Sequence, residues 1–252
     1  MKPYYEDSAV TIYHGDCRDI LPQLPKVDLV ITSPPFNLGN THHTGNNRHN
    51  PYEDEMPEDE YQGVQIYVLN LLYDLVADNG HLFYQHKNRI KDGIQITPYE
   101  WLLKTLWLIK QEIVWFNGSP NFDKCRFYPM TERIYWLGKT RSSKIDNVIN
   151  RHDLWKIEPE GLNCPHPRAF PIEIPQNIIG CCPEANLIVD PYMGWGTTLR
   201  AAKNLGRKAI GIDVRESSCE IAAKRMSQTV FALATEAECL NSDSKAQQGE
   251  LV

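Results

Sequence analysis

The position of a glycine-rich loop near the end of the chain constrains the fold more than any other feature of the sequence. An apolar run at residues 187–189 leads to Asp190, the loop carries Gly194 and Gly196, and a second apolar run at 209–212 ends at Asp213. Strand, glycine loop, helix, strand and acid is the order of the unit that usually opens a doubly wound α/β sheet. Too few residues follow Asp213 to form the other strands. The N-terminal half must supply them, so the sequence predicts a circularly permuted sheet.

Apolar patterns along the rest of the chain alternate between strand and helix. They predict an α/β, three-layer, Rossmann-like fold with a mainly parallel sheet. We expect strands at 10–13, 27–31, 82–84, 112–116, 133–137, 187–189 and 209–212, and helices at 18–24, 60–77, 99–108, 172–182, 198–205 and 216–234. A single domain is expected over 1–235, with an irregular inserted segment at 117–160 and a disordered polar tail at 236–252.

The composition limits the class of protein. The chain has 252 residues, of which 42% are hydrophobic and 23% charged, as in soluble globular proteins. It contains no apolar run long enough to cross a membrane, and its polar start does not resemble a secretory signal. The seven cysteines include no C-x-x-C pair. We therefore expect a cytoplasmic protein with reduced thiols and no bound metal.

The segment Thr32-Ser33-Pro34-Pro35-Phe36 follows the strand expected at 27–31. Two prolines end the strand and fix the backbone just beyond it. A hydroxyl, a carbonyl and an aromatic ring then leave the sheet in a rigid array that suits a flat molecule carrying an amino group. A plain strand end with a core phenylalanine is an equally good interpretation of these five residues alone.

The glycine loop differs from both common phosphate-binding loops. Leu199 occupies the place of the third glycine in G-x-G-x-x-G, and no G-K-[ST] is present. Asp190 would repel a pyrophosphate but attract an ammonium group, which S-adenosylmethionine carries. Asp213 is placed to bind ribose hydroxyls. The alternative is that Asp190 caps a helix and the glycines form a tight turn. Because ligands bind outside the carboxyl ends of such strands, we expect Asp16, Ser33 and Asp190 around one crevice.

These motifs resemble those of S-adenosylmethionine-dependent DNA methyltransferases that modify exocyclic amino groups, in particular the permuted beta class. Ser33-Pro34-Pro35-Phe36 is similar to the class's catalytic motif, and the segment 190–198 (D-P-Y-M-G-W-G-T-T) departs from its cofactor loop only by Tyr192 in place of phenylalanine. The segment 14–17 (H-G-D-C) resembles the element that meets the cofactor's adenine. The segment 166–171 (H-P-R-A-F-P) resembles the element that closes over its methionine end.

The resemblance implies a methyltransferase domain and assigns roles to residues. The catalytic set is Ser33, Pro34, Pro35 and Phe36, and the cofactor-binding set is Asp16, Cys17, Thr32, His166, Phe170, Pro171, Asp190, Pro191, Gly194, Gly196, Thr197, Thr198 and Asp213. Ser33 Oγ and the Pro34 carbonyl would accept the two N–H groups of the amine and turn its lone pair toward the methyl group. The target base would be flipped out of the duplex onto Phe36. The chain has no Pro-Cys pair, which methylation at cytosine carbon 5 would require.

A basic stretch at 124–144 interrupts an otherwise acidic chain of net charge −6. It lies within the segment 117–160, where the class keeps its target-recognition residues, and it predicts phosphate contacts with double-stranded DNA. The expected contacts are Lys124, Arg126, Arg133, Lys139 and Arg141. The alternative is an ordinary solvated face. A monomer or homodimer is expected, with a cognate restriction endonuclease as a possible partner.

The serine at position 33 favours N4 of cytosine as the acceptor, because in this family serine more often accompanies cytosine and aspartate or asparagine more often accompanies adenine. N6 of adenine is the alternative. A protein-amide methyltransferase also uses a Pro-Pro-aromatic motif but would not need the basic stretch. An inactive DNA-binding relative would be expected to lack Ser33, Asp190 or Asp213, and all three are present.

Overall fold

The computed structural model describes residues 1–38, 54–118, 125–148, 152–159 and 170–228. Within these residues, nine strands form one sheet in the order β1-β2-β11-β10-β3-β4-β8-β7-β9. All run parallel except β1 and β8, which are antiparallel to their neighbours. The strands are β1 (Tyr5–Glu6), β2 (Val10–His14), β3 (Val27–Thr32), β4 (Val76–His86), β7 (Leu108–Phe116), β8 (Thr131–Gly138), β9 (Leu154–Lys156), β10 (Leu187–Asp190) and β11 (Lys208–Asp213).

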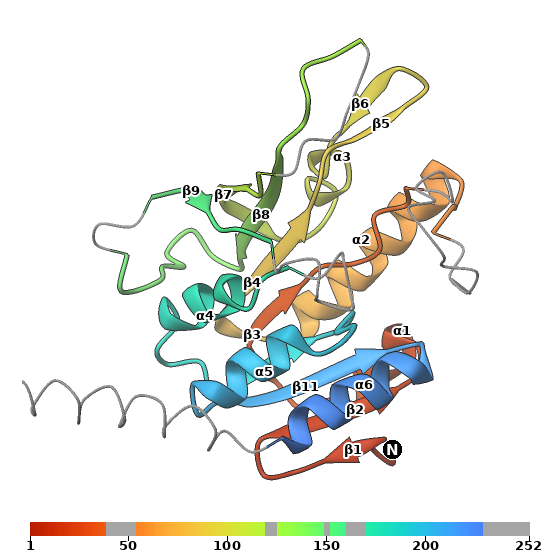
Figure 1. Ribbon diagram of the computed structural model, residues 1–252. Helices are drawn as coiled ribbons and strands as arrows, with labels where there is room; N and C mark the ends of the chain where they lie inside the picture. Colours follow the sequence, from red (N-terminus) through yellow and green to blue (C-terminus); the bar gives the residue numbers. More distant parts are fainter. Residues whose placement is uncertain (39–53, 119–124, 149–151, 160–169, 229–252) are drawn as a thin grey trace, which may run out of the picture.

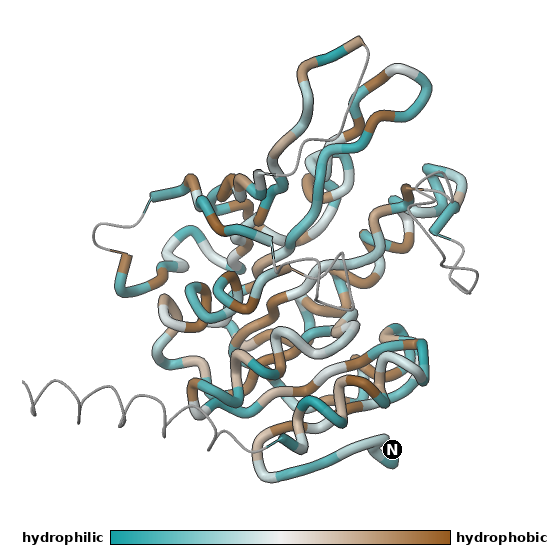
Figure 2. Tube along the Cα trace, in the orientation of Figure 1, coloured by the Kyte–Doolittle hydropathy of each residue, from teal (hydrophilic) through white to brown (hydrophobic). Residues whose placement is uncertain are grey.

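Helices cover both faces of the sheet, which gives three layers (Figure 1). One face carries α1 (Cys17–Ile20), the 3-10 helix η1 (Leu21–Gln23), α2 (Glu58–Leu75) and α3 (Tyr99–Leu102). The other carries α4 (Glu173–Gly180), α5 (Thr197–Asn204) and α6 (Glu216–Ser227). Each face has its own apolar core, and Figure 2 shows hydrophobic segments gathered along the strands between them.

The strand order confirms the circular permutation. Strands β10 and β3 are parallel neighbours, with Ile188 opposite Leu29, although they come from opposite ends of the chain. From β10 the chain crosses through α5 to β11, and from β3 it crosses through α2 to β4. These crossover helices lie on opposite faces of the sheet. The pair is therefore the switch point of the fold, where α/β sheets bind their ligands.

One expected helix is shorter than predicted, and one expected strand is confirmed but lies in the main sheet. The helix expected at 99–108 is the single turn α3, because the following apolar residues do not face the core: Leu103 and Leu106 are exposed, and Leu108 begins β7. The strand expected at 133–137 lies not in an insertion but inside the sheet, between β4 and β7. Its consecutive apolar residues are buried on both faces, as expected of an interior strand.

The packing of the glycine loop against β11 gives a test of the fold. A Cβ on Gly211 would lie 2.4 Å from Met193 Sδ and 2.7 Å from Leu199 Cδ2. We expect Gly211→Ala to lower the free energy of unfolding by about 1–3 kcal/mol in urea denaturation, because the core there has no spare volume. Gly63→Ala in α2 is the control, since its Cβ would meet nothing within 4 Å. It should raise stability by up to about 1 kcal/mol. Equal losses in both variants would contradict this packing.

Candidate active site

The carboxyl ends of four adjacent parallel strands bring the acidic and polar residues of the chain to one edge. Strands β2, β11, β10 and β3 lie in this order and end next to Asp16, at Asp213, at Asp190 and next to Ser33. The Gly15 N–H donates to the Asp213 carbonyl at 3.0 Å, which joins the first two of these ends. The motifs that are distant in sequence thus meet at the switch point.

Asp190 is a buried carboxylate that ties the two halves of the chain together. Its Oδ1 accepts from Thr32 Oγ1 at 3.0 Å and from the Tyr192 N–H at 3.1 Å, and its Oδ2 accepts from Thr198 Oγ1 at 2.7 Å. Burial raises the pKa of this carboxyl to about 6, although the three hydrogen bonds act in the opposite direction. A carboxylate offers about four acceptor positions, so one remains on Oδ2.

Asp213 fixes the conformation of the glycine loop. Its Oδ2 accepts the Gly194 N–H at 3.0 Å, and its Oδ1 accepts the Arg215 N–H at 2.8 Å. Gly194 and Gly196 have φ angles of 51° and 77°, the left-handed region that favours glycine. A Cβ on Gly196 would lie 3.2 Å from the Ala222 side chain of α6, whereas one on Gly194 would enter open space. The loop thus presents bare backbone at Gly194. The neighbouring predicted cofactor residues Pro191, Thr197 and Thr198 are buried.

Asp16 and Cys17 lie at the start of α1. Asp16 caps this helix by accepting the Arg18 N–H at 2.8 Å, and its carboxylate is also paired with the Arg18 guanidinium, with Nε at 3.0 Å from Oδ1. The Cys17 thiol is buried, which raises its pKa to about 11, and it hydrogen-bonds the side chain of Tyr192. The hydroxyl that distinguishes Tyr192 from the expected phenylalanine therefore has a partner, and the thiol stays protonated at neutral pH.

Aromatic side chains from α2 and β4 contact the Pro-Pro segment and support it. The Tyr61 hydroxyl donates to the Pro35 carbonyl at 2.7 Å, and its oxygen also lies 2.7 Å from His86 Nε2. The rings of Phe36 and His86 have centroids 4.6 Å apart. Burial lowers the pKa of His86 to about 3, so this ring is neutral and acts as part of the wall. These contacts within the protein hold the segment in place.

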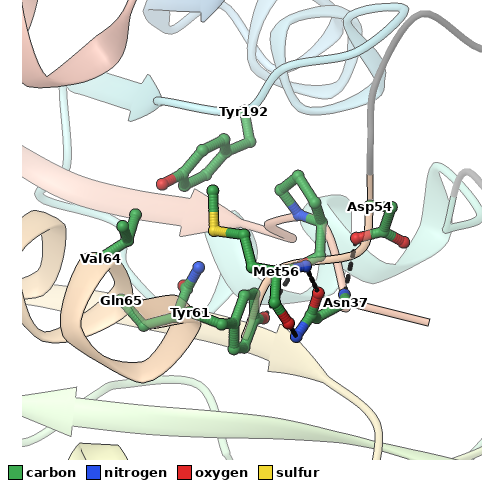
Figure 3. Close-up of a pocket in the computed structure, with 8 residues that line it drawn as sticks. Asn37, Asp54, Met56, Tyr61, Val64, Gln65 and Tyr192 are labelled. Atoms are coloured by element: carbon green, nitrogen blue, oxygen red, sulfur yellow. Dashed lines mark hydrogen bonds between the residues drawn. The ribbon is translucent and has the colours of Figure 1, made fainter. Parts of the chain in front are cut away.

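A cavity of about 30 Å³ lies between this segment and α2, lined by Pro35, Tyr61 and Tyr192 among others (Figure 3). Asn37 closes it on one side, because its N–H donates to Asp54 Oδ1 at 2.6 Å and its Oδ1 accepts the Met56 N–H at 2.6 Å. The cavity has room for water but not for a nucleoside-sized ligand. It therefore belongs to the support of the segment.

The predicted basic patch is not one surface, which corrects the expectation from sequence. Strand β8 separates Arg126 from Lys139 and Arg141, and its eight residues span about 25 Å. Because β8 is antiparallel to β4, Lys139 follows it at the edge opposite Ser33, where its Nζ lies 3.7 Å from Asp78. Arg133 is paired with Glu112 at 2.6 Å. Of the predicted residues that the structure describes, Arg126 and Arg133 lie toward the candidate site, Arg133 because it is opposite His86 at the end of β4. Arg126 Nη2 donates to the Gly93 carbonyl at 2.9 Å.

Two predicted positions, Lys124 and His166, lie outside the described residues. Phe170 and Pro171, from the same segment as His166, are buried just before α4. Among the described residues, no group of histidine, cysteine or acidic side chains is arranged to bind a metal ion. None of the helices in the described ranges is both long and apolar enough to cross a membrane.

The sequence analysis missed two polar residues beside Ser33. The Ser33 hydroxyl donates to Gln85 Oε1, and Gln85 Nε2 donates to Glu132 Oε2. Burial raises the pKa of Glu132. Both residues continue the alternation of core residues along β4 and β8, from Phe83 and Ile134 respectively. The sequence contains a signal for both residues, because each is a polar side chain at a position where the strand pattern predicts an apolar core residue.

The chain is similar to known DNA methyltransferases over most of its length. The family model N6_N4_Mtase, described as "DNA methylase", matches residues 27–224. Type II methyltransferase M.ScaI of Streptomyces caespitosus is 27% identical over 265 residues, which cover 89% of this chain and 84% of that protein. PvuII DNA methyltransferase (cytosine-N4-specific) has a TM-score of 0.76 at 20% identity, over 95% of this chain and 94% of its own. The M1.HpyAVI–SAM complex has a TM-score of 0.61 at 22% identity, over 87% and 100%.

The buried charge of Asp190 predicts a pH-dependent effect on stability. With a folded pKa of about 6 against an ordinary 3.8, the fold loses stability as the pH rises from about 4 to 6, and the full loss remains at higher pH. We expect Asp190→Asn to raise the free energy of unfolding at pH 8 by up to about 3 kcal/mol. The gain should shrink to a small remainder as the pH falls toward 4, because the folded carboxyl is protonated there and the unfolded one is close to its ordinary pKa of 3.8. Chemical denaturation at both pH values measures this.

Asp190→Ala serves as the control, because it also removes the acceptors of Thr32 and Thr198 and should be destabilised at both pH values. A gain for Asp190→Asn that is the same at pH 4 and pH 8 would show that the charge of Asp190 is not the cause.

Proposed function

Because this chain belongs to the DNA methylase family, we propose that it transfers a methyl group from S-adenosylmethionine to an exocyclic amino group of a flipped base in double-stranded DNA. The observation that carries the proposal is the meeting of the Ser33-Pro34-Pro35-Phe36 segment with the glycine loop on the adjacent strands β3 and β10. Asp190 accepts hydrogen bonds from Thr32, which precedes the Pro-Pro segment, and from Thr198, which follows the glycine loop. A base held by the first motif and a cofactor held by the second would share one edge of the sheet.

The described residues fit S-adenosylmethionine. The remaining acceptor position of Asp190 suits an ammonium group, and the bare backbone at Gly194 allows a ligand to approach closely. Asp213 lies where a ribose hydroxyl could bond, and Asp16 and Cys17 lie where an adenine could, as the family resemblance implies. A nearby cation would lower the raised pKa of Asp190, so binding and ionisation would support each other. The SAM-bound fold neighbour supports the same choice.

The residues of the Pro-Pro segment would activate the amine without a covalent intermediate. S-adenosylmethionine supplies an electrophilic methyl group on a sulfonium. Ser33 Oγ and the Pro34 carbonyl each accept one N–H of the amine, which turns the nitrogen lone pair toward that methyl. In this proposal the nitrogen would take the methyl group as its bond to sulfur breaks, the cofactor would leave as the neutral thioether S-adenosylhomocysteine, and the proton lost from the methylated nitrogen would pass to solvent. Phe36, supported by His86, would hold the ring of the base. Positioning and stabilisation of the growing positive charge supply the rate.

We favour N4 of cytosine as the acceptor, with N6 of adenine as the alternative. Serine at position 33 supports cytosine through the family resemblance, and the neighbour described as cytosine-N4-specific shares the fold over 95% of this chain. The family itself includes enzymes for both amines.

We propose that DNA lies across the site edge beside the hairpin formed by β5 (Arg89–Lys91) and β6 (Ile94–Ile96). In Figure 1 this hairpin and the segment before β8 project next to each other, and the Arg126–Gly93 hydrogen bond joins them. Phe127 and Tyr128 are exposed there. Within the described residues, the proposed DNA-contacting surface is therefore this hairpin together with residues 125–130, and not the whole of 117–160.

Two exposed arginines of the basic stretch provide a matched test of this surface. We expect Arg126→Glu to weaken DNA binding, and to reduce the slope of log affinity against log salt by about 0.9 for a lost phosphate contact. Arg141→Glu makes the same charge change at the opposite edge and should change neither, because it lies beyond β8. Fluorescence anisotropy with labelled duplexes at several salt concentrations measures both. Equal effects of the two variants would indicate a nonspecific effect of charge.

Substitution of Ser33 tests the chemistry. We expect Ser33→Ala to lower the single-turnover rate of methyl transfer on the order of a hundredfold, because one acceptor for the developing ammonium is lost. Affinity for S-adenosylmethionine and DNA should change little. Ser33→Asp should keep partial activity, since a carboxylate also accepts. Digestion of the product to nucleosides should give N4-methylcytosine. Recovery of N6-methyladenine would correct the base alone, whereas 5-methylcytosine would refute the mechanism.

A further inference from the structure

A row of polar side chains on three adjacent strands leads away from Ser33 toward the far part of the sheet. Gln85 is at the end of β4 and Glu132 near the start of β8, and the order β3-β4-β8 makes these strands neighbours. Ile31 lies opposite Phe83, and Gln85 lies opposite Ile134. Since alternate residues of a strand share a face, Ser33, Gln85 and Glu132 lie on the same face. At the site edge, these polar side chains occupy positions on the face that apolar core residues fill further along the same strands.

The hydrogen bonds along this row have a fixed direction. The Ser33 hydroxyl donates to Gln85 Oε1, and Gln85 Nε2 donates to Glu132 Oε2. Asn117 Nδ2 lies 3.4 Å from the other oxygen, Glu132 Oε1, and also donates. Gln85 is almost fully buried, with 4% of its surface exposed, so it has no water to replace these partners.

The charge of Glu132 decides which end of the Gln85 amide faces Ser33. An ionised carboxylate only accepts, so it must meet the amide nitrogen of Gln85 and leave the amide oxygen for Ser33. Burial, the largest effect, raises the pKa of Glu132, while the positive charge of Lys87 and the two amide donors act in the opposite direction and favour the ionised carboxylate that accepts both N–H groups. Rotating the Gln85 amide would place its oxygen against the oxygens of Glu132, which is unfavourable.

The orientation of Gln85 in turn decides what Ser33 offers to a substrate. A serine has one O–H and two acceptor lone pairs. With the O–H donated to Gln85, both lone pairs remain for an incoming amine. With the Gln85 amide reversed, its N–H would occupy a lone pair, and the free hydroxyl hydrogen could bond the amine's own lone pair and block attack on the methyl group.

We propose that Glu132 is a positioning residue that acts through Gln85 to fix Ser33 as a hydrogen-bond acceptor for the amino group of the target base. The proposal rests on the proposed function and deepens it. It assigns a role to β8, a strand outside the catalytic motif, and explains why a carboxyl group and an amide occupy positions that the strand pattern predicts to be apolar.

The test uses the near-isosteric variant Glu132→Gln in the full chain. Its neutral amide can present either an oxygen or a nitrogen to Gln85, so the bias on Gln85 is lost. We expect the single-turnover rate to fall roughly tenfold, because a hydrogen bond to a charged group is replaced by one between neutral groups. Affinities for S-adenosylmethionine and DNA should stay within about twofold. Glu112→Gln is the control: this carboxylate is on the neighbouring strand β7, bonds Tyr99 and Arg133, and should leave the rate unchanged.

A double-mutant cycle separates positioning from a general structural effect. If Glu132 acts through Ser33, Glu132→Gln should cost nothing further once Ser33→Ala is present. The same fold-loss in both backgrounds would show that Glu132 only supports the structure, and would overturn the proposal. A wild-type protein that methylates DNA, combined with an unchanged rate in Glu132→Gln, would refute this inference alone. A wild-type protein that transfers no methyl group to a base amine would refute the proposed function instead.

The contact also has a readout that does not depend on activity. The side-chain amide signals of Gln85, identified by their loss in Gln85→Ala, should be protected from hydrogen exchange in the wild type. They should shift and exchange faster in Glu132→Gln but not in Glu112→Gln. Signals that are the same in all three proteins would contradict the orientation of Gln85 by Glu132 whatever the reaction is.

Discussion

The hydrogen bonds of one buried carboxylate connect everything that the proposed chemistry needs. Asp190 accepts from Thr32, which precedes the Pro-Pro segment, and from Thr198, in the first turn of α5 after the glycine loop. These residues come from opposite halves of the chain, and only the parallel pairing of β3 with β10 brings them together. Their common acceptor is destabilised by burial when it is ionised. A protein keeps such a group when its charge is required, and a cationic cofactor would require it.

The acids of the site differ in what they do for the fold. Asp16 is satisfied by its own helix and by Arg18, and Asp213 by the backbone of the glycine loop and Arg215. These contacts are local. Asp190 instead bridges distant segments. The protein's own hydrogen bonds thus fix all three acids, which limits the conformational entropy that binding must overcome.

The two faces of the sheet support the Pro-Pro segment in different ways. On the face of α2 and α3, neutral aromatic rings and the Tyr61 hydroxyl hold Pro35 and Phe36. On the opposite face, Gln85 and Glu132 form a directed row of hydrogen bonds to Ser33. The first arrangement fixes the position of the backbone and the ring. The second fixes the direction of a single hydroxyl, which packing alone cannot do because a hydroxyl rotates freely.

The sequence by itself determined the local chemistry and the permuted order of the motifs along the chain. The Pro-Pro stop after β3, the left-handed glycines after Asp190 and the late position of that loop follow from residue types and spacing, so the permuted α/β fold was predictable. The pairing of β8 between β4 and β7 was decided only by the tertiary structure. A buried apolar strand has no local signal for its partners, because pairing depends on contacts distant in sequence. That pairing brings Glu132 to Gln85, and it divides the basic stretch between two opposite edges of the sheet.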